Sequence, residues 1–482
     1  MTAPTRLPGK AAGMGKARRA RTRIERDTMG EVRVPADALF GAQTARAVEN
    51  FPISGLRAHP AFVDATVRVK LAAARVNARL GFLPRRKARA IERAAGEVLG
   101  GGHREQFVVD VYQAGAGTSH NMNVNEVLAS RATEILGGRR GEAGLVHPND
   151  DVNMAQSTND VVPTAIRLAA LELLPGAAGA LDDLAATFAR KARAWDRVVK
   201  AGRTHLMDAT PIRLGQEVSG WAASLRAAAA RIRACVPELS RLGLGGTAVG
   251  TGLNAHPRYA RLAVAELSRL TGRRLALAPN PFAAMQSLGP FVALSGALRG
   301  AAVELIRIGG DVRLLGSGPS TGLGELRLPP VQPGSSIMPG KVNPSMAEML
   351  AMVCLQVVGL DAAIAGAAAS GQLELNVMMP LVAFDLCHAL QILANAVRAF
   401  DLRCARGLEA DPERARFYAE RTVSLATALA PRIGYAAAAE IVKESVRTGR
   451  SIVDLAAERG GMSLAEARRI LDPARLTRPG RA

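Results

Sequence analysis

The sequence predicts a mainly α-helical protein built around a bundle of long helices. From about residue 155 to residue 410 the chain is dominated by Ala, Leu and Arg, which are good helix formers. Apolar residues recur from Phe291 to Leu315 in steps of three and four, the spacing of a helix face that packs in a bundle. Strand patterns are few, so little sheet is expected.

The composition fits a folded protein and disfavours nucleic-acid binding. Of 482 residues, 48% are hydrophobic, enough for a large core. The formal charge is +20, but residues 1–24 carry part of it, with seven basic residues and no acidic one. Aromatic residues are 4% of the chain, too few to form stacking platforms for bases. We therefore expect a basic, disordered tail and no nucleic-acid partner.

The spacing of the cysteines and of the charged residues indicates the cellular location of the protein and which cofactors and partners to expect. The four cysteines show no C-x-x-C spacing, which disfavours a disulfide framework or a zinc ribbon and favours a cytoplasmic location. We expect no metal, because no cluster of His, Cys and carboxylates has ligand spacing. No uninterrupted apolar run approaches the ~18 residues of a membrane span, since residues such as Arg167 and Glu172 intervene, so no membrane partner is expected.

The chain divides into four predicted segments. These are a basic tail over 1–23, an N-terminal mainly helical domain over 24–155, a central helical bundle over 156–412 and a small C-terminal helical domain over 413–482. Within them, residues 25–60 should be irregular with a short extended piece, and residues 61–100 should be helical apart from a break at Pro84. After Ala410 we expect short helices joined by turns at Pro431, Gly434 and Gly460–Gly461.

Polar segments rich in Gly, Ser or Asn interrupt the helices and are the candidates for chemistry. The three longer ones are 113–126, 147–160 and 334–344, and two shorter ones are 202–205 and 245–254. The glycine-rich piece lacks the Gly-Lys-Ser/Thr ending of a nucleotide-binding loop and has no βαβ context, which argues against a nucleotide site. Hydroxyls, amides and Lys341 together suit a small dianion. Elimination beside a carboxylate would need a base for a carbon-bound proton and donors for the enolate-like product.

These segments carry a resemblance to a known family. Residues 334–344 (GSSIMPGKVNP) are similar to the signature loop of the fumarase/aspartase superfamily. Further matches follow in the right order at 117–126, 147–150, 156–160, 202–205 and 245–254. The resemblance implies a three-domain fold with a central bundle of long helices. It also implies a homotetramer whose active sites are shared between three subunits, and elimination from a C4 dicarboxylate to give fumarate without a cofactor.

The resemblance also implies the roles of individual residues. Ser335 would be the base that removes the proton, and His205 would lie in the site with Glu348 orienting it. Substrate contacts would come from Thr118, Ser119, Ser157, Thr158, Asn159, Thr204, Ser336, Lys341 and Asn343. A secondary dicarboxylate site would include His147, Asn149 and Asp150. His120 matches neither branch of the superfamily, so its role stays open.

The leaving group is ammonia in aspartases and water in fumarases, and the sequence has features of both. Ala116, Thr158 and the segment 371–378 resemble aspartases, whereas the segments 204–211 and 244–250 resemble fumarases. Water is a poor leaving group that benefits from a proton-donating network, so a hydroxyl missing at Ala116 should harm a hydratase more. Our main prediction is therefore aspartate ammonia-lyase, with class II fumarate hydratase as the alternative. A helical scaffold that has lost its chemistry is disfavoured because Ser335 and Lys341 are present.

Overall fold

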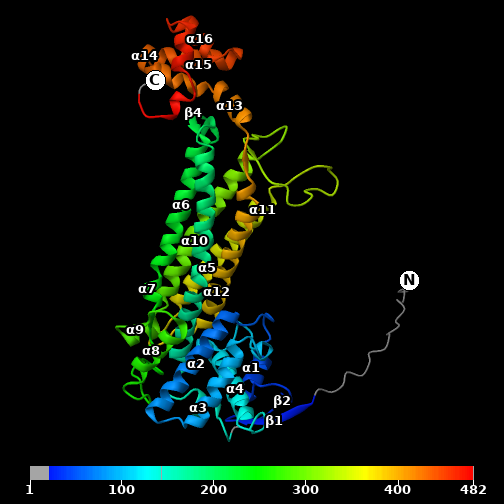
Figure 1. The fold of residues 1–482 in the computed structure, drawn as a ribbon, viewed down its shortest axis with the longest axis vertical. Coiled ribbons are helices and arrows are strands. Elements are labelled where there is room, and N and C mark those ends of the chain that lie inside the picture. The colour runs from blue at the N-terminus through cyan, green and yellow to red at the C-terminus, as the bar shows by residue number, and fades with distance from the viewer. Residues whose placement is uncertain (1–20, 143, 481–482) are drawn as a thin grey trace, which may run out of the picture.

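The structure, a computed structural model, describes residues 21–142 and 144–480 and is mainly helical, as predicted. Three parts follow one another along a long axis, with the first helices at one end, a bundle of long helices in the middle and the last helices at the other end (Figure 1). Each part has its own cluster of buried hydrophobic residues. The described strands form four two-stranded sheets.

The first part combines a hairpin with four helices. Strands β1 (Thr22–Asp27) and β2 (Gly30–Pro35) pair antiparallel. Helices α1 (Ala42–Asn50), α2 (Pro60–Leu80), α3 (Arg85–Leu99) and α4 (Thr118–Ile135) follow. Pro84 caps α3 and separates it from α2, as expected.

Two predictions for the first part need correction. The predicted tail ended at residue 23, but Thr22 and Arg23 belong to β1 and residue 21 directly precedes it. Residues 1–20 of the predicted tail lie outside the described residues. The stretch 25–60, predicted to be irregular, contains α1. This helix has only nine residues and no acidic residue in its first turn. Its sequence therefore gives a weak helix signal.

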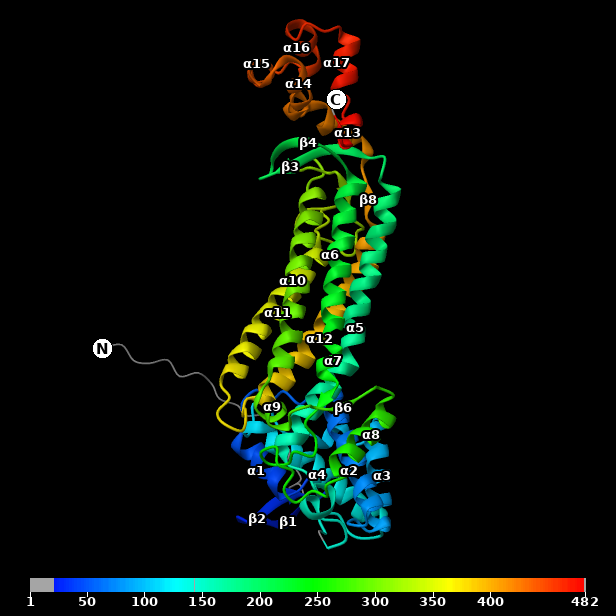
Figure 2. The same cartoon turned by 90° about the vertical axis from the view of Figure 1, so that its left-hand side faces the viewer.

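The bundle contains five long helices. They are α5 (Thr158–Ala194), α6 (Leu214–Ala234), α10 (Gly289–Leu315), α11 (Ser345–Ala369) and α12 (Met379–Arg403), which run up and down the long axis (Figures 1 and 2). The apolar positions of α10 that predicted a bundle helix are all buried, from Phe291 at 0% exposed to Leu315 at 5%. The heptad-like spacing therefore marked the face that packs.

The connections between the long helices lie at the two ends of the bundle. At the upper end in Figure 1 are the hairpin of β3 (Val199–Thr204) and β4 (Met207–Arg213) and the loop between α10 and α11, which contains β7 (Leu326–Arg327). At the lower end are α7 (Val236–Leu239), β5 (Arg241–Leu242), α8 (Tyr259–Thr271), β6 (Ala276–Leu277) and α9 (Pro281–Gln286). The polar segments are therefore divided between two distant ends.

The last part consists of short helices, as predicted. After β8 (Glu409–Ala410) come α13 (Pro412–Arg421), α14 (Ala430–Ile433), α15 (Tyr435–Thr448), α16 (Ile452–Arg459) and α17 (Leu464–Ile470). Gly434 and Gly461 have positive φ and form turns, whereas Pro431 lies in the first turn of α14 and not in a turn between helices.

Three bundle segments are long and apolar enough to span a membrane by length and composition alone, namely α5, α11 and the stretch Met379–Gly407. The sequence predicted no membrane span because its apolar runs without any charged residue are too short. The mean hydropathy of an 18-residue window can be high even when the window contains one or two charged residues. The apolar windows of α5 and Met379–Gly407 are mostly buried, but only 33% of the window of α11 is buried. Met352 and Leu355 of α11 are 65% and 61% exposed. Exposed apolar faces of this kind are typical of surfaces that contact another molecule.

Candidate active site

The predicted site residues form two groups at opposite ends of the bundle. Thr118, Ser119, Ser157, Thr158 and Asn159 lie at the lower end, where α4 and α5 begin. The upper-end group is on the β3–β4 hairpin and on the segment from the α10–α11 loop into α11; it comprises Thr204, His205, Ser335, Ser336, Lys341, Asn343 and Glu348. The groups lie far apart within one chain, because α5, which connects the two ends of the bundle, has 37 residues and is about 55 Å long.

At the lower end, a glycine allows the first turn of α4 to approach α5. Gly117 has a φ of +90°, and a Cβ there would lie 3.1 Å from the Val162 side chain. Thr118 follows with an exposed side chain, and Ser119 is buried. Asn121 then places its Nδ2 3.3 Å from Thr158 Oγ1. The first turns of α4 and α5 are thereby connected through the side chains of Asn121 and Thr158.

The start of α5 is a capping box that also holds the glycine-rich segment. Ser157 Oγ accepts from the Asn159 N–H at 3.2 Å, and the Asp160 carboxylate accepts from the Ser157 N–H at 2.9 Å. The other Asp160 oxygen accepts from the N–H groups of Gly245 and Thr247 at 2.9 and 3.1 Å. The result is a helix N-terminus, which favours anions, beside a glycine-rich loop.

Asp160 lies entirely buried under this loop. Burial raises its pKa to about 6, although three backbone N–H groups and the charge of Lys70 act in the opposite direction. Asn159, next to it, donates from Nδ2 to Ala248 O at 2.8 Å. The carboxylate and the amide therefore fix the glycine-rich loop against α5 from two sides.

Two positions that the sequence left in question are buried in this region. His120 Nε2 is 3.0 Å from Thr66 Oγ1, and its ring stacks on Phe62. Burial, with the nearby Lys70 charge, lowers the pKa of His120 to about 3, so it is a neutral packing residue. Ala116 is 4% exposed, and its N–H donates to Val377 O at 2.8 Å. A serine hydroxyl at position 116 would be buried against other protein atoms. Its absence is therefore weak evidence for ammonia over water as the leaving group.

The predicted secondary site forms a short turn before α5. His147 precedes the π-helical turn Pro148–Val152, and Asn149 and Asp150 are exposed. The Asp150 N–H donates to His147 Nδ1 at 3.1 Å. Asp151 supports the turn from inside, since its carboxylate accepts from the His147 N–H and from Lys87 Nζ, both at 2.7 Å. The two exposed residues remain accessible to a ligand.

At the upper end, His205 lies in the tight turn of the β3–β4 hairpin. Thr204 pairs with Met207, and the two residues between them, His205 and Leu206, have φ values of +55° and +61°. Positive φ at both central positions is the type I′ pattern, which ordinarily favours Asn-Gly. A strained turn therefore presents an exposed imidazole. Glu325 fixes the base of the hairpin, because it pairs with Lys200 at 3.3 Å and with Arg203 at 3.0 Å.

The Ser335 loop closes on itself. The Gly334 N–H donates to Lys341 O at 2.9 Å, and Asn343 Nδ2 donates to Gly334 O at 2.6 Å. A Cβ at Gly334 would lie 2.5 Å from Lys341 O, so only glycine fits there. Ser335 Oγ accepts the N–H groups of Ile337 and Met338 at 3.2 and 2.9 Å. Two N–H dipoles aimed at one hydroxyl oxygen favour its deprotonated form.

The remaining predicted residues have no common site within one chain. Glu348 lies in the first turn of α11, and its carboxylate is 4.0 Å from the Arg313 guanidinium. Ser336 and Lys341 are exposed on the loop. Lys341 and Asn343 lie at the opposite end of the bundle from the start of α5, so the two sets of residues cannot meet within one chain. One chain therefore supplies parts of a site, and other copies would have to complete it.

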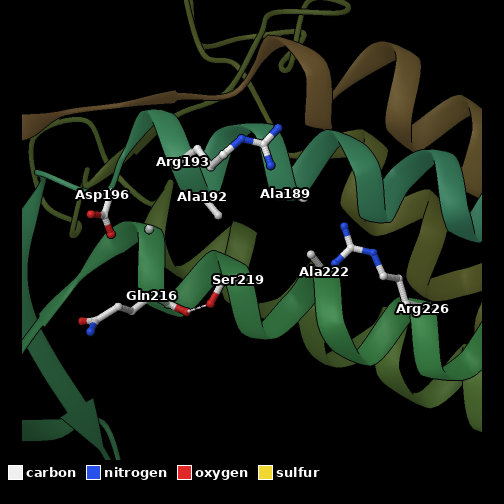
Figure 3. A pocket seen from close by; sticks show the side chains of 9 residues that line it. Ala189, Ala192, Arg193, Asp196, Gln216, Ser219, Ala222 and Arg226 are labelled. Carbon is white, nitrogen blue, oxygen red and sulfur yellow. Dashed lines mark hydrogen bonds between the residues drawn. The ribbon is translucent and has the colours of Figure 1, made fainter.

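A separate groove between α5 and α6 contains none of the predicted residues (Figure 3). Its volume is about 470 Å³, and small side chains such as Ala192 and Ala222 leave the space. Two of the polar side chains along it have partners within the chain, since Ser219 Oγ donates to Gln216 O at 2.7 Å and Asp196 pairs with Arg213 at 2.7 Å. It is a gap between helices and offers no reactive group.

Sequence reasoning missed the polar residues that hold the lower group together. The polar segments 113–126 and 147–160 contain Asn121, Asn153 and Asp160, but the sequence predicted no role for these three residues. Lys70 was not singled out, although it lies among Val67, Val69 and Leu71 of a predicted helix. A lysine within an apolar helix face was a signal that could have identified it.

Comparisons with known proteins agree with this arrangement. Residues 30–359 match a family described as "Lyase", and residues 425–478 match "Fumarase C C-terminus". Curated relatives named "Fumarate hydratase class II" include one from Ralstonia nicotianae, 50% identical over 90% of this chain and 95% of the relative. Another, from Myxococcus xanthus, is 49% identical over 91% of this chain and 94% of the relative.

Solved structures show the same fold. A "fumarate lyase:delta crystallin" from Brucella melitensis bound to cobalt has a TM-score of 0.91 and 48% identity, covering 95% of this chain and 100% of that one. A class II fumarase from Schistosoma mansoni has a TM-score of 0.91 and 36% identity, covering 95% of this chain and 99% of that one. With its signature loop, its three-part helical fold and these relatives, this chain is a lyase of the fumarase/aspartase superfamily.

Proposed function

We propose that this protein is a class II fumarate hydratase, which interconverts malate with fumarate and water. The observation that carries the proposal is the identity of about half of all positions, over nine-tenths of the chain, with relatives that bear this name. These relatives favour fumarate hydratase, the alternative prediction, over the aspartate ammonia-lyase that Ala116 suggested. The burial of Ala116 explains why that residue was a poor guide.

The proposed reaction begins at Ser335. Its oxygen, with two N–H donors aimed at it, takes a proton from the carbon beside one carboxylate. The electron pair of that C–H bond moves into the carboxylate and gives an enolate-like dianion, which the Lys341 ammonium and Asn343 would stabilise. As the pair returns to form the C=C bond, the C–O bond of the neighbouring carbon breaks, and the leaving hydroxyl accepts a proton from solvent, so that water is released. Ser335 then returns its own proton to solvent, which balances the cycle. Ser336 would contact the same carboxylate.

The opposite end of the substrate would meet the start of α5. Thr118, Ser157, Thr158 and Asn159 would hold the second carboxylate and the leaving hydroxyl, where the helix N-terminus favours negative charge. Thr204 and His205 would come from a hairpin of a further copy, with Glu348 orienting the imidazole. The turn of His147, Asn149 and Asp150 would bind a second dicarboxylate nearby.

We propose that the protein works as a homotetramer. Two features support this: the two groups of site residues lie at opposite ends of a bundle whose helix α5 is about 55 Å long, and α11 exposes an apolar face. Four bundles packed together would cover such faces and bring loops from three copies to each site. We expect the enzyme to act in the cytoplasm.

A side-by-side assay tests the proposal. The purified protein, supplied with malate or with aspartate at equal concentration, should increase the ultraviolet absorbance of fumarate with malate. Turnover of aspartate in place of malate would identify an ammonia-lyase, and turnover of neither would overturn the enzymatic proposal.

A further inference from the structure

Lys70 is a buried cation beneath the start of α5 that the proposed mechanism does not use. Its side chain, on α2, is 0% exposed. Among the described residues it has no carboxylate partner within 4.0 Å; its Nζ donates instead to Asn153 Oδ1 at 2.8 Å. Lys200, the other fully buried lysine, pairs with Glu217 at 2.8 Å and Glu325 at 3.3 Å. Burying a charge without a counter-ion is costly, so Lys70 calls for an explanation.

Asn153 connects Lys70 to the substrate-binding group. Its Oδ1 accepts from Asn121 Nδ2 at 3.3 Å and from Asn125 Nδ2 at 3.2 Å, both on α4, as well as from Lys70. Asn121 Nδ2 also lies 3.3 Å from Thr158 Oγ1. Asn153 is therefore the hub of a partly buried network that links α2, α4 and the first turn of α5.

Protonated Lys70 brings a positive charge to this network, and the Asp160 carboxylate offsets part of that charge. The titratable groups that face Lys70 are Asp160 from α5 and His120 from α4. Asp160 is committed to three backbone N–H groups, and its pKa is raised to about 6. His120 is neutral, since its pKa is lowered to about 3. An ammonium in this low-dielectric region would act strongly on a dianion bound at the start of α5.

We propose that Lys70 is a positioning residue for the dicarboxylate, which fixes Asn153, Asn121 and thereby the Thr158 hydroxyl, and adds a buried positive charge behind that hydroxyl. The proposal rests on the proposed function, because it concerns the same site. Lys70 does not touch the substrate; it acts through the asparagines and through its charge.

The main test is Lys70→Met, which retains an unbranched side chain but removes the charge and the hydrogen bond. We expect the KM for malate to rise about tenfold with a smaller change in kcat, since the lost interaction holds the substrate. Calorimetry with succinate, which has no leaving group, should show a similar loss of affinity. Unchanged KM and unchanged succinate affinity would overturn the inference.

A second residue on α2 provides a matched control. Asn77 is 2% exposed, and its Nδ2 donates to Met154 O at 3.0 Å, on the residue after Asn153. Asn77→Leu removes a tie to the same segment without removing charge. If both variants raise KM equally, Lys70 has only a structural role and the proposal is wrong. If only Lys70→Met does, the charge and the asparagine hub are responsible.

Variants at Asn153 keep the test decisive if Lys70→Met does not fold. Asn153→Leu removes the acceptor and should raise KM. Asn153→Asp retains the acceptor but neutralises the charge of Lys70 and should lower the succinate affinity too, so an Asn153→Asp variant that binds succinate as tightly as the wild type would contradict the role of the charge. Where all variants fold, Lys70→Met and Asn153→Leu should combine less than additively, because they break one network. Full additivity would contradict the proposed route through Asn153.

A pH series separates the charge from the packing. Burial lowers the pKa of Lys70 to about 7, so the wild-type affinity for succinate should fall as pH rises through this value. Lys70→Met should lack that step. Wild-type protein that binds no succinate and converts neither malate nor aspartate would refute the proposed function itself. An active wild type with an unaffected Lys70→Met variant would refute only this inference.

Discussion

The carboxylate of Asp160 accepts the backbone N–H of Gly245 at 2.9 Å, and this contact joins the first turn of a bundle helix to the glycine-rich loop 85 residues away. Its second oxygen caps the same helix through the Ser157 N–H at 2.9 Å. One buried carboxylate thus determines both the start of α5 and the position of the loop beside it. The order of the lower group of site residues depends on that carboxylate being ionised.

Protonation of Asp160 should therefore reduce activity. Its pKa is about 6, and a protonated carboxyl would turn an O–H toward a backbone N–H that needs an acceptor. We expect kcat/KM for malate to fall as pH decreases through about 6, and Asp160→Asn to be impaired at every pH, without this step. Steady-state pH profiles of the two proteins provide the measurement. An identical step in the variant would assign it to another group.

Stability should respond to Asp160 in the opposite sense. The folded protein takes up a proton on Asp160 below about 6, whereas the unfolded chain does so only near 3.8. Because the folded state binds more protons over this range, this group makes the free energy of unfolding larger as pH falls from 6 to 3.8. Denaturant titrations of wild type and Asp160→Asn over that range isolate the contribution. If the free energy of unfolding of the wild type rises over this pH range by no more than that of Asp160→Asn, Asp160 is not the source of the pH dependence.

Ser335→Ala should remove the proposed base. We expect kcat for malate to fall by a factor of about 10²–10⁴, with the melting temperature and the assembly unchanged, because Ser335 lies on a loop outside the core. Ser320→Ala, a serine exposed in the same loop, serves as the control and should retain full activity. A Ser335→Ala enzyme with near-normal kcat would mean that another group takes the proton.

The sequence predicted the fold better than it predicted the site. Long helices were identifiable because the apolar residues of α10, from Phe291 to Leu315, repeat on one face. The short helix α1 and the true start of β1 were missed, since nine residues or a few extended ones leave little periodicity. Local patterns carry most information where an element is long.

The motifs located the candidate residues but not the groups that hold them. Ser335 and Thr158 were identified from their segments, yet Lys70 and Asn153 become neighbours only when α2 folds against the turn before α5. The significance of Ala116 was also misjudged, because its burial is a tertiary property. Long-range packing decides such cases, and one sequence does not display it.

The exposed apolar face of α11 should be an interface between copies. Replacing Met352 and Leu355, both more than 60% exposed, by Asp should dissociate the assembly, because burying two carboxylates in an apolar contact is costly. We expect light scattering to report monomers or dimers, with activity lost together with the assembly. Val446→Asp, at a residue 70% exposed on α15, should leave both unchanged. Active monomers would refute shared sites.

Mixing two inactive variants tests directly whether a site is shared. Ser335→Ala removes a residue of the upper group, and Asn159→Ala removes one of the lower group, at the other end of the bundle in the same chain. If each site combines these residues from different copies, co-folding equal amounts should leave both residues intact in about a quarter of the sites. The mixture should then recover a comparable fraction of the wild-type rate, whereas each variant folded alone should remain inactive. If both residues of a site came from one chain, no combination of subunits could rebuild an intact site, and the mixture would stay as inactive as its parts.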